Sequence, residues 1–418
     1  MKKVYTIVTQ MGDYVFSILQ ASAISLSSTN ILPYNGGGGF KLKILFLLFP
    51  FIFFSCGRSE KDMQEGIIID TALNTPNEIK LSSLVDSITY TPLETKDNLL
   101  IGQVTKMLVS DRFIYIFDEI SSSLYCFDLN GKFVKKIGNK GVGPGEYTNI
   151  DDFDIYNQRI YLFDCNLRKL FVYNNNGILE KEVKTNYWAE NIHVIDNSWI
   201  ALYGGYKDNA PYKENGKTPN LLFLNIHNGE SKSAAFFDSQ IEMKEVCGSY
   251  KLFTDFGNFL SPLENRIYQL DSKLSLKEKV SFLLSESQEN IQNIYLQKIK
   301  NEKIDVGQVE ELIQGFPMWV SINETNDYIV SVYMVEHKQS VIFYNKKSGE
   351  VIKGQSDSGK LPVINDIDGL AQFILYTSHG DMLYSLVQPY AIDKNKVSWA
   401  KDIEDEDNPI IVTMHIKK

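Results

Sequence analysis

The sequence predicts an all-β protein built from repeated small sheets, and two observations carry this prediction. The composition is 44% hydrophobic and 12% aromatic over 418 residues, which is too apolar for a disordered chain and too varied for a coiled coil. The second observation is a repeat at a constant offset, in which Tyr115, Phe117, Asp118 and Gly131 match Tyr161, Phe163, Asp164 and Gly177.

Each repeat is predicted to contain four strands. The stretches Arg112 to Gly138 and Gln158 to Lys184 each show a short aromatic strand, a polar turn, a second strand, an Asn-Gly turn and a third strand. Asp152 to Tyr156 adds a fourth strand before the second unit. One such sheet cannot bury both of its faces, so neighbouring sheets must supply the core and the ring must close. The predicted fold is therefore a β-propeller.

Ring closure is predicted to use both ends of the chain. The segment Glu78 to Leu93 lies before the first unit and contains the strand-like run Ser87 to Thr91. We expect this run to complete the blade that the C-terminal strand begins. The length from Asn77 to Lys418 suits six or seven blades, and length alone does not choose between them.

The later part of the chain carries weaker copies of the repeat and two insertions. Gly204 to Pro219 is rich in Gly, Pro and Asn, so we expect a long loop within the third blade. Between Glu286 and Gly315 the hydrophobic period becomes helical, which predicts a small helical insertion near 286–315. We expect this helix to cover apolar surface, with a lid over a ligand as the alternative.

The N-terminal part resembles a bacterial export signal. Lys41 and Lys43 precede an unbroken apolar run, Ile44 to Phe54, which is too short to cross a membrane as a helix. The run ends at Ser55, Cys56 and Gly57, which resembles the lipobox of bacterial lipoproteins. We expect residues 41–55 to be a lipoprotein signal peptide and Cys56 to be the lipidation site. A plain signal peptide with a chance cysteine is the alternative.

These boundaries divide the chain into four parts. Residues 1–40 precede the signal and show no sustained helix or strand period, so we interpret them as a mis-assigned upstream segment or an extended n-region. Residues 56–76 are expected to form a flexible tether. Residues 77–418 are expected to form the propeller with its helical insertion.

The charge of the chain argues against a nucleic-acid partner, and the spacing of its cysteines argues against a zinc site. A net charge of −10 and a pI near 5.2 give little electrostatic basis for holding a phosphate backbone, so no nucleic-acid partner is predicted. The three cysteines after Cys56, which are Cys126, Cys165 and Cys247, match no zinc spacing, and we interpret them as core residues.

No catalytic motif stands out. Gly141 to Tyr147 (GVGPGEY) lacks the strand-and-helix setting of a phosphate loop, and Asp118 and Asp164 occupy equivalent repeat positions where an Asp caps a turn. Asp151, Asp152 and Asp154 could bind calcium, but alternation along a strand points Asp151 away from Asp152 and no EF-hand spacing accompanies them. The five histidines are dispersed and there is no GxSxG elbow. No metal site and no cofactor are predicted.

Several short motifs carry a family resemblance. They are the residues Asp86, Ser87 and Tyr90 to Glu94, then Ile137 and Gly138 leading into GVGPGEY, then Asn408 and Pro409. Together with the lipobox they resemble the six-bladed β-propeller lipoproteins of Gram-negative bacteria, an NHL-like family. The resemblance implies six blades rather than seven and a location in the cell envelope, and it implies no reaction. Enzymatic NHL propellers use axial histidines, which keeps a metal-dependent lyase or hydrolase open as an alternative.

Candidate ligand contacts are sought in the non-repeating segments before innermost strands, because those loops face the central channel. Aromatic faces with a few hydrogen-bonding groups suit sugars or extended peptides. The candidates are Glu146, Tyr147, Trp188, Glu190, Tyr250, Lys251 and Trp319. The predicted function is a binding or scaffolding module for a glycan, peptide or protein partner, with no catalysis expected, held by lipid at the outer membrane or the periplasmic face.

Overall fold

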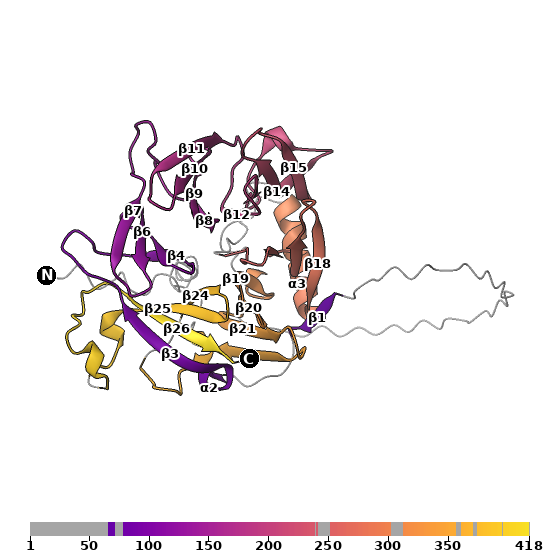
Figure 1. Ribbon diagram of the computed structural model, residues 1–418. Helices are drawn as coiled ribbons and strands as arrows, with labels where there is room; N and C mark the ends of the chain where they lie inside the picture. Colours follow the sequence, from indigo (N-terminus) through magenta and orange to yellow (C-terminus); the bar gives the residue numbers. More distant parts are fainter. Residues whose placement is uncertain are drawn as a thin grey trace, which may run out of the picture.

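Six four-stranded sheets stand around a common axis in the part of the chain that the structure describes (Figure 1). The structure is a computed structural model, and it describes residues 66–71, 78–238, 240, 251–301, 312–356, 361–370, 374–394 and 396–417. The prediction of an all-β, six-bladed β-propeller with a small helical insertion is confirmed. Cys56, Cys247 and Tyr250 lie outside the described residues, as do residues 1–55.

The first three blades each consist of four strands that follow one another in the chain and pair antiparallel. Blade 1 contains β4 (Val104–Val109), β5 (Phe113–Asp118), β6 (Ser123–Asp128) and β7 (Phe133–Ile137). Blade 2 contains β8 (Asp152–Tyr156), β9 (Arg159–Asp164), β10 (Lys169–Asn174) and β11 (Leu179–Lys184). Blade 3 contains β12 (Asn191–Val194), β13 (Trp199–Tyr203), β14 (Lys217–Asn225) and β15 (Ser231–Asp238). The first strand of each blade lies nearest the axis (Figure 1).

The other three blades include two that borrow a strand from the N-terminal part of the chain. Blade 4 contains β16 (Asn258–Ser261), β17 (Arg266–Leu270), β18 (Leu276–Leu283) and, at its outer edge, β1 (Ile67–Asp70). Blade 5 contains β19 (Met318–Glu324), β20 (Tyr328–Val335), β21 (Lys338–Asn345) and β22 (Val351–Ser356). Blade 6 contains β24 (Ile374–His379), β25 (Met382–Val387), β26 (Ile410–Ile416) and β3 (Val85–Pro92).

The ring closes through the pairing of β3 with β26, as the sequence predicts. The two strands run antiparallel, with Thr91 opposite Ile411 and Thr89 opposite Thr413. An N-terminal strand thus occupies the outer edge of the blade that the C-terminal strand belongs to. Both ends of the ring are held in one sheet, so blades 1 and 6 stay adjacent.

The segment expected to be a flexible tether, residues 56–76, contains a strand. Its described part, 66–71, includes β1, which pairs in parallel with β18 over the four positions from Ile67 opposite Val280 to Asp70 opposite Leu283. This strand was missed because its partner lies more than 200 residues away and its own sequence carries no turn signal. Short elements follow: β2 (Ile79–Lys80) pairs with β23 (Val363–Ile364), and α2 (Leu81–Leu84) leads into β3.

Blade 4 departs from the regular repeat at its inner edge. The innermost position is taken by the short segment Lys251 to Thr254, whose backbone bonds to β16: the Leu260 N–H donates to the Leu252 carbonyl at 2.9 Å. The same segment also bridges to blade 5, because the Ile322 N–H donates to the Lys251 carbonyl at 2.9 Å. Lys251 is therefore fixed at the boundary between two blades.

The apolar core lies between neighbouring blades. Between blades 1 and 2, for example, Tyr147, Phe153 and Phe171 are fully buried with Cys126. Cys126 and Cys165 are buried and unpaired, which confirms their interpretation as core residues.

The turn role of the repeated aspartates is also confirmed. Asp118 accepts from the Gly102 and Gln103 N–H groups at 3.1 and 2.8 Å. Asp164 makes the equivalent contact with the Thr148 N–H at 2.6 Å. Each carboxylate fixes the entry into its own blade, so the recurrence has a structural cause.

The helical insertion is confirmed in its described part, α3 (Glu286–Asn301). Tyr295 and Ile299 of this helix are buried against Tyr206 in the long loop of blade 3 and against Phe316 before blade 5. The helix thus covers apolar surface on the ring, as expected. Single-turn 3-10 helices lie at Ala210–Tyr212, Pro389–Ala391 and Ser398–Ala400. None of the helices in the described ranges combines the length and hydropathy needed to cross a bilayer.

We predict that Asn408 is a main support of ring closure. Its Oδ1 accepts from the Ile101 N–H, and its Nδ2 donates to the carbonyls of Glu94 and Leu99, each at 2.8 Å. Asn408→Asp keeps the shape and the first bond but removes both donations, which should lower the free energy of unfolding by about 3 kcal/mol. Denaturant unfolding measures this, with the exposed Asn176→Asp as the control. Equal loss in both variants would contradict the assignment.

Candidate functional site

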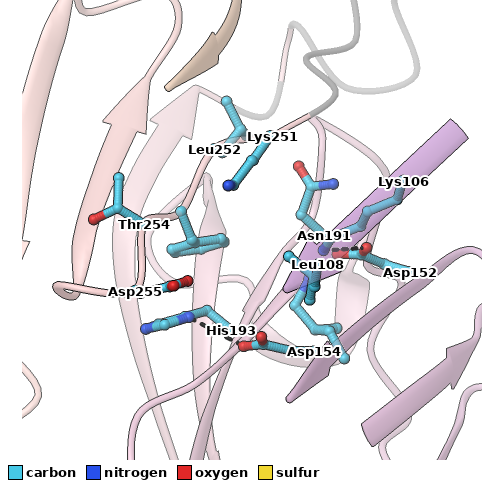
Figure 2. A pocket seen from close by; sticks show the side chains of 12 residues that line it. Lys106, Leu108, Asp152, Asp154, Asn191, His193, Lys251, Leu252, Thr254 and Asp255 are labelled. Carbon is cyan, nitrogen blue, oxygen red and sulfur yellow. Dashed lines mark hydrogen bonds and ion pairs between the residues drawn. The ribbon is translucent and has the colours of Figure 1, made fainter. Parts of the chain in front are cut away.

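A polar cavity lies on the propeller axis, lined by three innermost strands and the segment before β16. The cavity is small: the space between its lining atoms is about 310 Å³ when the open solvent at its mouth is included. Figure 2 shows the lining side chains converging on one space. The lining residues are Lys106, Leu108, Asp152, Asp154, Asn191, Ile192, His193, Lys251, Leu252, Phe253, Thr254 and Asp255.

Strand alternation places the polar side chains at the axis. Successive residues of a strand point to opposite faces, so residues two apart share a face. Asp152 and Asp154 share a face of β8, and Asn191 and His193 share a face of β12. Asp151 is directed elsewhere and accepts from the Cys165 N–H at 2.7 Å.

Both aspartates of β8 are fully paired. Asp152 forms an ion pair with Lys106 of β4 at 2.6 Å and accepts from the Ile192 N–H at 2.8 Å. Burial raises the pKa of Asp152, and Lys106 opposes that shift. The carboxylate links blades 1, 2 and 3 across their inner strands.

Asp154, two residues further along β8, likewise contacts one side chain and one backbone N–H group. It contacts the His193 Nδ1 at 3.1 Å and accepts from the Val194 N–H at 2.7 Å. Burial acts to raise the pKa of Asp154, but the bonds to His193 and the backbone outweigh it, so the pKa is lowered. The His193 ring also stacks on Phe253, with centroids 5.3 Å apart, which joins blade 3 to blade 4.

Lys251 is the buried cation of the cavity. Its Nζ donates to Asn323 Oδ1 at 3.0 Å and to Thr377 Oγ1 at 2.8 Å, so it joins blades 4, 5 and 6. The side chain is 8% exposed, and burial lowers its pKa from 10.5 to about 8. Both hydrogen-bond partners are neutral groups.

Two amides near the axis have an unpaired atom. Asn191 Oδ1 and Asn323 Nδ2 are buried without a hydrogen-bond partner in the described part of the chain. Their orientation follows from their neighbours: Asn191 Nδ2 donates to the Glu190 carbonyl at 3.0 Å, and Asn323 Oδ1 accepts from Lys251. A buried polar atom without a partner costs free energy unless something else satisfies it.

His379 joins blade 6 to the same region. Its Nε2 contacts Asp111 at 2.9 Å and its Nδ1 lies 3.6 Å from Asp255. The bonds to Asp255 and Asp111 raise the pKa of His379 to about 9. The histidine is therefore charged at neutral pH and pairs with these carboxylates.

Of the residues predicted from sequence, Lys251 lines the cavity. Tyr147 and Trp319 are 0% and 2% exposed and belong to the core between blades. Trp319 Nε1 donates to Asn265 Oδ1 at 2.8 Å, which is a structural bond. The segments before the innermost strands pass between two sheets before they reach the axis. Their aromatic residues are therefore buried between neighbouring blades.

The remaining candidates lie away from the cavity. Glu146 accepts from the Gly143 N–H at 2.9 Å within its own turn. Trp188 is half-buried against the core between blades 2 and 3. Glu190 faces Lys207 at 3.8 Å, and burial raises its pKa to about 7. Among the predicted residues that the structure describes, Lys251 alone lines the axial cavity.

Most of the polar residues that line the cavity lie on the first strand of a repeat. The sequence signal that could have found them is a polar residue at every second position of that strand. Asp152 and Asp154 were considered as calcium ligands and His193 was one of the five dispersed histidines, whereas Lys106 and Asn191 were overlooked. In the part of the chain that the structure describes, no three His, Cys, Asp or Glu side chains are grouped to hold a metal ion.

Comparisons with known proteins support the fold. The family model described as "Domain of unknown function (DUF4934)" matches residues 65–415. No curated protein matches the chain. A crystal structure from Bacteroides fragilis NCTC 9343, of a protein assigned as exported, is 17% identical with a TM-score of 0.64, and the match covers 85% of this chain and 100% of that one.

Two further solved structures are less similar. A member of the DUF4221 family from Bacteroides vulgatus is 13% identical with a TM-score of 0.48, over 82% of this chain and 99% of that one. A streptogramin B lyase is 11% identical with a TM-score of 0.39, over 79% of this chain and 88% of that one.

We predict that the burial of Lys251 makes stability depend on pH. The folded pKa is about 8 and the ordinary value is 10.5, so between these values the unfolded chain binds more protons at this residue. The free energy of unfolding of wild type should therefore rise relative to Lys251→Met by about 1.4 kcal/mol per pH unit in this window. Denaturant unfolding from pH 8 to 10.5 measures the slope. Leu252→Met is the matched buried control, and a Lys251→Met profile parallel to wild type would refute the prediction.

Proposed function

This chain belongs to the DUF4934 family, and from that premise we propose that it is a lipid-anchored binding module of the cell envelope. Its axial cavity takes a small polar group of a glycan, a peptide or a protein partner. The observation that carries the proposal is Asn191 Oδ1, a buried acceptor that lines the cavity and has no partner among the described residues. A ligand group with an O–H or N–H would satisfy it.

The ring is suited to holding a ligand in one geometry. The side chains of the cavity are fixed by bonds that run from blade to blade, such as Asp152 to the Ile192 N–H and Lys251 to Thr377. A site whose groups are already in place loses little conformational entropy when it binds. This favours recognition of a small group by a rigid frame.

The location rests on the N-terminal segment and one relative. The apolar run Ile44 to Phe54, ending at Cys56, has the form of a lipoprotein signal. The Bacteroides fragilis protein of similar fold is assigned as exported. Both support export of this chain, and the position of Cys56 at the end of the apolar run supports its attachment to a membrane through lipid. The motifs of the NHL-like lipoproteins agree with the same location.

An axial enzyme is the second candidate, and one observation favours it. His193 lines the cavity and its Nδ1 contacts Asp154 at 3.1 Å, an arrangement in which a carboxylate orients a histidine for proton transfer. The hydroxyl of the cavity is occupied, because Thr254 Oγ1 donates to Glu324 at 2.9 Å. The candidate is therefore a lyase or hydrolase that uses His193 as a base, with or without a metal ion.

We predict that Cys56 carries the membrane attachment. Cys56→Ser removes the thiol that is lipidated, so the protein should move from the detergent phase to the aqueous phase in a phase-partition assay and should lose incorporation of labelled fatty acid. Cys126→Ser changes a buried cysteine of the ring and is the control for the loss of a thiol. Retention of Cys56→Ser in the detergent phase would refute lipid anchoring at this residue.

We predict that a ligand screen distinguishes binding from catalysis. Glycans and envelope proteins are screened against wild type and against Asn191→Leu, which replaces the free acceptor with an apolar group. A binding module should show a ligand that is lost in this variant, recovered unchanged, with no dependence on chelators. Turnover of the ligand, or a stoichiometric metal whose removal abolishes activity, would establish the enzyme instead. A ligand that binds both proteins equally would remove the cavity from the function.

A further inference from the structure

The axial cavity contains a buried ammonium group that has no carboxylate partner. We propose that the cavity recognises a carboxylate, which lies against Lys251, while a hydroxyl or N–H group of the same small ligand donates to Asn191. This inference rests on the proposed function, because it names the chemistry of the ligand for the same site.

The charge pattern of the lining supports an anion despite its aspartates. Asp152 is paired with Lys106, and Asp154 with His193. Asp255 lies 3.6 Å from His379, which is charged at neutral pH. Every carboxylate of the cavity thus has a cationic or hydrogen-bonding partner already.

Lys251 differs from these groups. Its bonds go to an amide oxygen and a hydroxyl, and it forms no ion pair with any residue in the described ranges. Charged groups are rarely buried unless they are paired, because the loss of hydration is not offset. Asp255, Asp154 and Asp152 act on the ammonium only from a distance, so an anion that enters the cavity would be its first direct ionic partner.

The Lys251 ammonium has one N–H donor that is not used within the protein's described residues. Two of its three N–H groups are used by Asn323 Oδ1 and Thr377 Oγ1, and its backbone is fixed to blade 5 by the Ile322 N–H. A lysine in this position cannot turn away to bulk water, since it is 8% exposed. The third N–H is available to a ligand oxygen.

Asn191 defines the second contact. Its amide nitrogen is engaged by the Glu190 carbonyl, so its oxygen is the atom left free in the cavity. Figure 2 shows the ends of Lys251 and Asn191 directed into the same space. A ligand that fills both contacts needs an anionic acceptor and, beside it, a donor.

Several features favour a carboxylate over a phosphate. Phosphate sites generally use bidentate arginine or backbone N–H groups at a helix N-terminus. The lining has no arginine and none of its residues belongs to a helix. A single ammonium matches the single charge of a carboxylate. Hydroxy acids such as a uronic acid and small N-acyl amino acids both carry a carboxylate and, near it, an O–H or N–H donor.

Calorimetric titration at pH 7 tests the proposal with two matched pairs of probes. D-glucuronate is compared with D-glucose, and N-acetylglycine with N-acetylglycinamide, while inorganic phosphate tests the other anion. We expect one acid or both to bind at least tenfold more tightly than the neutral partner. The pair that shows this effect identifies whether the carboxylate comes from a sugar or from an amino acid.

The decisive variant is Asn323→Asp. It is isosteric and places a carboxylate on Lys251, which supplies the counter-ion from within, so acid binding should fall at least tenfold while thermal stability is kept or raised. Lys251→Met should lose the same binding. Asn176→Asp adds an equal charge at an exposed turn and should bind as wild type does.

Each outcome of the titrations either supports the carboxylate proposal or overturns it. Equal binding of acid and neutral probes, or binding of phosphate but of neither acid, would overturn the carboxylate proposal. So would the absence of binding by both acids. The proposed function is tested separately, because a neutral ligand that binds wild type and is lost in Asn191→Leu would keep the binding module and reject only the carboxylate.

Discussion

The structure depends on one constraint, which is that each sheet of the ring has two apolar faces and must be covered on both. A single open end would expose the faces of the first and last blades, so closure is a condition for the whole fold. The protein meets this condition by placing β3 and β26 in one sheet and by bonding Asn408 to the chain that leads into β4. The rest of the ring, including the arrangement at the axis, follows from that closed circle.

Closure brings the inner strands together, and their side chains then have to be satisfied. Polar residues at the axis bond to the neighbouring blade, as Asp152 does to the Ile192 N–H and as Ser378 Oγ does by accepting from the Glu324 N–H at 3.0 Å. Glu324 itself is 1% exposed and is paired with Lys346 at 2.9 Å. Hydrogen bonds between polar side chains thus connect the blades along the axis. The cavity is the place on the axis where Lys251 keeps an unused hydrogen-bond donor and Asn191 an unused acceptor.

The sequence predicts the local and repeated features well. The offset between Asp118 and Asp164 indicated turns that the structure confirms, and the strand-like run Ser87 to Thr91 lies within β3. The axial cluster could not be assembled in the same way. Lys251 meets Asn323 and Thr377 across 72 and 126 residues, and no local period relates these positions. The aromatic candidates Tyr147 and Trp319 were misplaced because a segment that ends near the axis first runs between two sheets.

The attachment of β1 has a mechanical consequence. The N-terminal chain contributes β1 to the outer edge of blade 4 and β3 to the outer edge of blade 6, so it is fastened to the rim at two separated places (Figure 1). A pull exerted from upstream of Gly66 loads the four-residue parallel ladder of β1 and β18 first. The ladder of β3 and β26, which shuts the circle, is shielded from that load until β1 has peeled away.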